Sequence, residues 1–185
     1  MRASIFLAQK SYSAAEIDLK RVLENKIDFE EALLMLARVY QKQGEIAKEK
    51  NTWHRILAKK PDHLAALKSL TKQYIKTNDW GKAEAMLNKA FTAAQNNTSI
   101  TELLIQLQAA KQDWNAVDDA IARLQKQPQG QEIATLWQAR FAVKKGENNK
   151  AISLYKQALN KNPEHKILLM SLRQISQHLG KHNEL

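Results

Sequence analysis

Few side chains in this 185-residue sequence are spaced for catalysis or metal binding. His178 and His182 are four residues apart, so both imidazoles would lie on one face of a helix, where two histidines could hold a metal ion. Gly180 between them weakens such a helix, and two ligands alone make a poor site. The adjacent carboxylates Glu30 and Glu31 would diverge on a helix, which excludes an acid–base pair. With no cysteine and no phosphate-binding or nucleophile motif, we expect neither an enzyme nor a cofactor.

The charge of the chain is strongly positive, with 29 Lys and Arg against 19 Asp and Glu and a formal net charge of +10. Such a balance favours anionic partners through long-range attraction that salt weakens. The basic residues form no contiguous block, so solvation of outward helix faces also explains them. We therefore expect a protein partner of acidic character and consider nucleic acid a less favoured partner.

These residues lie in a sequence that is built from a repeated unit. Ala15, Glu49, Ala83, Val117 and Ala151 are successive equivalent positions, separated by one constant interval with no insertion or deletion between them. Strong helix formers fill most positions, and runs that favour strands are missing. A fixed 34-residue period predicts an all-α solenoid of antiparallel helix pairs, without a β-sheet, whose core runs from one repeat to the next.

The segment Glu30–His63 is the clearest repeat, with two short amphipathic helices joined at Gly44 and closed by Pro61. Gly44 takes a left-handed conformation without steric cost, which ends the first helix. We expect one array over 1–185 that is part of a longer protein. Its predicted parts are a partial repeat 1–29, repeats 30–63, 64–97, 98–131 and 132–165, and a terminal half-repeat or capping helix 166–185.

Two repeats carry a family pattern at their packing positions: Leu36, Ala37, Tyr40, Gly44, Leu57 and Pro61, then Tyr74, Ala83 and Ala90. The chain resembles the tetratricopeptide repeat over its whole length. This resemblance implies a right-handed superhelix and a non-catalytic scaffold that binds a peptide in a concave groove lined by the first helix of each repeat. The sequence departs from the pattern at Glu49, where the family has a small Ala, and at Gln108 and Gln138. The LKRVLE segment is similar to bacterial arrays of exopolysaccharide and protein-sorting systems.

The groove can be located by helix geometry. At 100° per residue, positions 2, 5, 6, 9, 12 and 13 of a repeat lie opposite the packing stripe at positions 4, 7, 8 and 11. The basic residues among them would meet carboxylates, and the apolar ones would anchor the peptide. The candidate site residues are Leu34, Met35, Arg38, Lys42, Lys68, Lys72, Lys76, Leu136, Trp137, Arg140 and Lys144.

Several alternatives stay open. The lysines of this face could be merely solvated, and Trp137 could pack against a neighbouring helix. A basic inner face could instead bind RNA, as related pentatricopeptide arrays do, although the position-5 residues do not form a consistent base-reading set. Self-association through apolar faces is a third alternative. No apolar run is long enough to span a membrane. The sequence leaves the compartment open between the cytoplasm and, if a longer parent carries an N-terminal signal, the periplasm.

Overall fold

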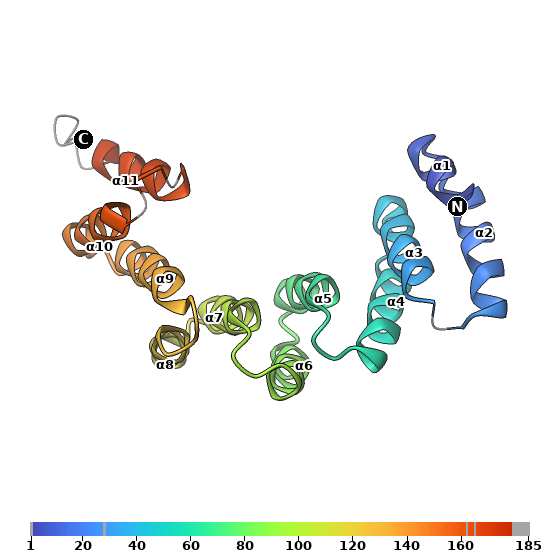
Figure 1. Ribbon diagram of the computed structural model, residues 1–185, viewed down its shortest axis with the longest axis horizontal. Helices are drawn as coiled ribbons and strands as arrows, with labels where there is room; N and C mark the ends of the chain where they lie inside the picture. The colour runs from blue at the N-terminus through green and yellow to red at the C-terminus, as the bar shows by residue number, and fades with distance from the viewer. Residues whose placement is uncertain (1, 28, 162, 165, 179–185) are drawn as a thin grey trace. The chain divides into compact units, whose positions relative to one another are not determined.

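The computed structural model describes residues 2–27, 29–161, 163–164 and 166–178, and these residues form helices and connecting turns without a strand. The chain divides into two compact units, unit 1 (1–95) and unit 2 (96–185). The helices of unit 1 are α1 (Arg2–Ala8), α2 (Tyr12–Asn25), α3 (Glu30–Gln43), α4 (Ile46–Lys59), α5 (Leu64–Thr77) and α6 (Trp80–Ala93). Those of unit 2 are α7 (Thr98–Lys111), α8 (Trp114–Gln125), α9 (Gly130–Lys144), α10 (Asn148–Lys161) and α11 (Lys166–His178) (Figure 1).

The repeat of the sequence is visible in the backbone. The second helix of each pair begins at the same position of its repeat, at Tyr12, Ile46, Trp80, Trp114 and Asn148. Two residues before each of these starts lies a residue with positive φ: Lys10 (58°), Gly44 (75°), Asn78 (57°), Gln112 (61°) and Gly146 (76°). The left-handed residue reverses the chain between the two helices of a pair. The predicted all-α helix pairs are therefore confirmed, while one continuous array over both units stays a prediction.

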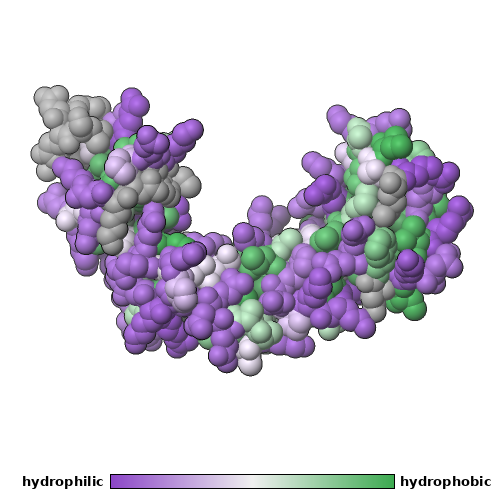
Figure 2. Space-filling model, viewed as in Figure 1, coloured by the Kyte–Doolittle hydropathy of each residue, from purple (hydrophilic) through white to green (hydrophobic). Residues whose placement is uncertain are grey.

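The core of unit 1 follows the predicted packing stripe. Leu33, Leu36, Ala37 and Tyr40 of α3 are buried, and the equivalent residues of α5 are buried too. They face the second helices, where α4 contributes Trp53, Ile56 and Leu57. Figure 2 shows hydrophilic side chains over most of the visible surface, as expected when the apolar stripes face the neighbouring helices.

The connection between α8 and α9 breaks the regular register of unit 2. Pro128 cannot continue a helix, and α8 ends at Gln125 with 12 residues instead of 14. Helix α9 then begins at Gly130, two residues before the predicted start of this repeat. The side chain of Gln127 is buried in the turn and donates through Nε2 to Thr101 Oγ1 on α7 at 2.8 Å. This bond ties the irregular turn to the preceding helix pair.

Candidate functional site

Helices α3 and α5 of unit 1 carry seven of the predicted groove residues. Arg38 and Lys42 on α3 are exposed, and so are Lys68, Lys72 and Lys76 on α5; these five residues are the basic face. Leu34 and Met35 lie half-buried on α3 beside them.

A cavity of about 360 Å³ opens between α3, α4 and α5, and Gln41, Lys72 and Lys76 are among its lining residues. The structure thus places Gln41, near the end of α3, and two lysines of α5 at one opening, the unit 1 cavity.

The basic face carries an excess of positive charge over the whole surface of α3 and α5 that was predicted to line the groove. Among the predicted groove positions of α3 and α5, Glu31 is the one acidic residue. The surface over α3 and α5 therefore has an excess of lysine and arginine that can attract carboxylates.

Glu49 lies at the inner side of the unit 1 cavity, although it occupies a packing position. Its side chain is only 6% exposed, and its Oε1 accepts a hydrogen bond from Trp53 Nε1 and another from Ser69 Oγ, both at 2.9 Å. These bonds explain how a carboxylate is tolerated where the resemblance implies alanine: neutral donors from its own helix and from α5 offset part of its lost hydration.

Helix α9 of unit 2 carries the other four predicted residues, and one expectation about them is wrong. Trp137 is only 9% exposed and packs in a core cluster with Ile105, Val117 and Phe141, so it is not an exposed anchor. Its Nε1 donates to Glu102 Oε1 on α7 at 3.0 Å.

Trp137 packs into the core because the next residue along α9, Gln138, is polar. Gln138 occupies the predicted packing position of α9, and burying the large indole of Trp137 instead avoids burying an amide. Leu136 is half-buried against the cluster formed by α9, α10 and α11.

The two basic residues of α9 lie over aromatic rings. The guanidinium of Arg140 is 5.2 Å from the centroid of the Trp137 ring, and Lys144 Nζ is 5.7 Å from that of Trp114. Cation–π contacts of this kind hold a cation at an exposed site without neutralising its charge. Both side chains remain exposed and available to an anion.

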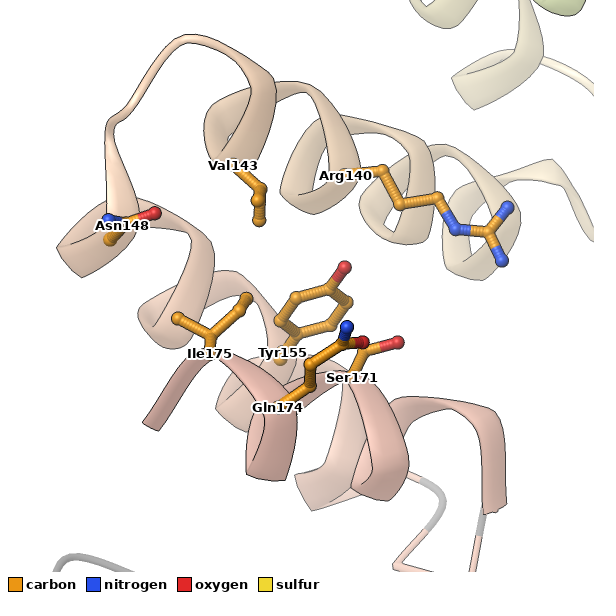
Figure 3. A pocket seen from close by; sticks show the side chains of 7 residues that line it. All are labelled: Arg140, Val143, Asn148, Tyr155, Ser171, Gln174 and Ile175. Carbon is orange, nitrogen blue, oxygen red and sulfur yellow. The ribbon is translucent and has the colours of Figure 1, made fainter. Parts of the chain in front are cut away.

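A second cavity, the unit 2 cavity of about 420 Å³, lies between α9, α10 and α11. Figure 3 shows its lining side chains, among them Arg140, Asn148, Tyr155, Ser171 and Gln174. Burial raises the pKa of Tyr155, and a hydrogen bond with Ser171 lowers it by less, so the phenol stays protonated at neutral pH. The cavity therefore offers a guanidinium, hydroxyl groups and amides.

The two cavities occupy equivalent places in the repeat, each between the two helices of one repeat and the first helix of the next. A shift of three repeats along the sequence relates Gln41, Ile46, Ser69, Lys72 and Gln73 of the unit 1 cavity to Val143, Asn148, Ser171, Gln174 and Ile175 of the unit 2 cavity. The site residues predicted from the sequence all belong to first helices. The second helices, which contribute Ile46, Glu49, Asn148 and Tyr155, were missed. The departure from alanine at Glu49 was the one available signal.

The described residues were searched for metal-binding clusters and for membrane-spanning helices. In the described part of the chain, no cluster of three His, Asp or Glu side chains could hold a metal ion. The spacing of His178 and His182, which the sequence left as a poor metal site, cannot be checked, because His182 lies outside the described residues. None of the helices within the described ranges has the length and apolar character to cross a membrane.

Comparison with known proteins identifies the repeats. Residues 31–63 and 138–167 each match a family model described as tetratricopeptide repeat. DnaJ homolog subfamily C member 3 of Rattus norvegicus is 31% identical over 157 residues, which cover 85% of this chain and 27% of that protein. The chain thus spans about a quarter of the length of this relative.

Solved structures agree with this assignment at the level of the fold. A thermophilic TPR protein of Thermus thermophilus has a TM-score of 0.60 at 19% identity, with 94% of each chain covered. YrrB, described as a TPR protein with an unusual peptide-binding site, has a TM-score of 0.59 at 16% identity, with 91% of this chain and 87% of that chain covered. The helix pairs define a helical-repeat protein. The chain belongs to the tetratricopeptide repeat family, whose members generally serve as scaffolds for protein–protein interaction.

Proposed function

We propose that this protein is a non-catalytic scaffold whose basic face binds an acidic segment of a partner protein. The observation that carries the proposal is the row of exposed lysines on α5, Lys68, Lys72 and Lys76, beside Arg38 and Lys42 of α3. Lysines at 68, 72 and 76 follow one another at i, i+4 spacing and lie on one side of the helix. An extended or helical acidic segment could place several carboxylates along them.

Apolar side chains next to the basic face would add affinity and orientation. Leu34 and Met35 keep part of their surface exposed on α3, and Ile46 at the start of α4 is 58% exposed. Exposed ion pairs contribute little each, so a binding face of this kind needs apolar contacts as well. We infer that the preferred segment alternates acidic residues with one or two apolar ones. YrrB, a protein of similar fold, has a peptide-binding site, which is in keeping with a peptide ligand for this protein.

The proposal is tested with an array of short acidic peptides that differ in their apolar residues, probed with the purified protein. We expect binding to the acidic peptides and none to the same peptides with Lys in place of Glu. The Lys68→Glu, Lys72→Glu double variant should weaken binding about tenfold, since two attractions become repulsions. The matched control is Lys82→Glu, Lys89→Glu on α6, which changes the net charge equally outside this face.

Equal weakening by both double variants would mean that only net charge matters and would refute a specific face. Single-stranded RNA serves as the competing probe. Binding to RNA in preference to the acidic peptides, with a steep dependence on salt, would refute the proposal in favour of a nucleic-acid partner.

A further inference from the structure

The unit 1 cavity contains a buried acid that the basic face does not explain. Glu49 is 6% exposed, and its equivalents in the repeats beginning at 64 and 132 are Ala83 and Ala151, both fully buried and small. Burying a carboxylate costs free energy unless its oxygens are well satisfied. The arrangement around Glu49 satisfies one oxygen and leaves the other open.

A chain of hydrogen bonds fixes the carboxylate. Ser69 has one hydroxyl hydrogen, which it donates to Glu49 Oε1, so its oxygen acts as acceptor toward Gln73 Nε2 at 3.5 Å. Trp53 Nε1 donates to the same Oε1. Within the described residues, Glu49 Oε2 receives no hydrogen bond.

The same chain orients the Gln73 amide. Because its nitrogen faces Ser69, its Oε1 points elsewhere, and in the part of the chain that the structure describes this buried oxygen has no hydrogen-bond partner. Glu49 and Gln73 both line the unit 1 cavity. Because Gln73 Oε1 is buried from solvent, the acceptor that the cavity leaves open is Glu49 Oε2, and a cationic donor satisfies a carboxylate oxygen best.

The lysines around the cavity do not supply that donor. Lys50 lies over the Tyr74 ring, 4.0 Å from its centroid, and 4.0 Å from Asp79 Oδ2. Lys72 and Lys76 are exposed at the opening, and Glu49 forms no ion pair with any lysine or arginine among the described residues. The cavity therefore has a negative interior and a positive rim.

We propose that the unit 1 cavity receives the ammonium group of a single lysine in the acidic partner segment. This inference rests on the proposed function. An ammonium donates three hydrogen bonds and is carried on a flexible aliphatic stem, which could lie along Ile46 while the ammonium meets Glu49 Oε2. Acidic residues that flank this lysine would meet Lys72 and Lys76 at the rim. A ligand that is basic overall would be repelled by a protein of net charge +10.

The test uses pairs of N-acetylated acidic peptides that carry either lysine or norleucine at one position, so that the pair differs by the ammonium alone. We expect wild-type protein to bind the best lysine peptide about tenfold more tightly than its norleucine partner. The Glu49→Gln variant keeps a carbonyl oxygen for Trp53 and Ser69 but loses the charge. It should bind both peptides equally, with the affinity of the wild type for the norleucine peptide.

Retained affinity of Glu49→Gln for the norleucine peptide also shows that this variant is folded. The inference is overturned if the wild type shows no lysine preference, or if the preference survives in Glu49→Gln. If norleucine peptides bind through Lys68 and Lys72 without a gain from lysine, the proposed function stands and only this inference fails. If no acidic peptide binds at all, the proposed function fails as well.

Discussion

The close approach of α8 and α9 makes Gly130 the most sensitive small residue that we can identify in unit 2. A Cβ at this position would lie 1.8 Å from the carbonyl oxygen of Leu124, whereas real Cβ atoms keep at least 3.0 Å from such atoms. The contact is with backbone, so no side chain can rotate away. The Gly130→Ala variant must therefore open the α8–α9 turn until these two atoms are at least 3.0 Å apart.

The expected cost follows from the groups that this movement disturbs. Overpacking of a well-packed site costs about 1–3 kcal/mol. The same turn holds the Gln127–Thr101 hydrogen bond, and a buried amide that loses its partner costs about 1–3 kcal/mol. Alanine gains about 0.5–1 kcal/mol over glycine in a helix, which offsets only part of this. We expect Gly130→Ala to lower the free energy of unfolding by about 2–4 kcal/mol.

The assay is urea unfolding followed by circular dichroism, with the midpoint and slope compared between variants. Gly81→Ala in α6 is the matched control, because no atom lies within 4 Å of a Cβ added there and helix propensity alone should raise stability slightly. A Gly130→Ala protein as stable as the wild type, beside a stabilised Gly81→Ala, would refute the steric reasoning. In Gly130→Ala, amide hydrogen exchange should become faster in unit 2, where the stability is lost.

Two further predictions concern stability. Gln112→Gly should raise the free energy of unfolding by about 0.5–1 kcal/mol, since glycine adopts the left-handed conformation there without strain, and Gly44→Gln should lower it by a similar amount in the same urea assay. The pKa of Glu16 is lowered by its hydrogen bond with Lys20 and by the hydrogen bonds from Gln43 and Tyr40. The ionised carboxylate therefore stabilises the folded state at pH values above its ordinary pKa of 4.5, and this stabilisation is lost as the pH falls through the depressed pKa. Unfolding measured from neutral to acidic pH should therefore show a smaller loss of stability in Glu16→Gln than in wild type, and an equal loss in both would contradict this assignment.

Much of the fold could be predicted because the determining interactions are local. The stripe of Leu33, Leu36, Ala37 and Tyr40 follows helical periodicity, and its burial is what the structure shows. The left-handed residue before each second helix recurs with the repeat, although glycine is present only at Gly44 and Gly146. The sequence signal at the other turns is therefore the period itself.

The candidate site was less predictable because it depends on contacts between helices. Trp137 and Gln138 are neighbours, and which of them faces the core depends on how α9 packs against α7 and α8. The early start of α9 follows from Pro128, but its close approach to Leu124 could not be derived from a pattern.

The sequence alone determined the helical-repeat class, the period and the row of lysines on one helix face, since each follows from spacing along a helix. Only the tertiary structure decided what Glu49 does. Its partner Ser69 lies on the next helix, and the cavity that both line exists only when α3, α4 and α5 pack together. A carboxylate that looked like a packing defect in the sequence became a fixed acceptor at a cavity because donors from two helices meet there.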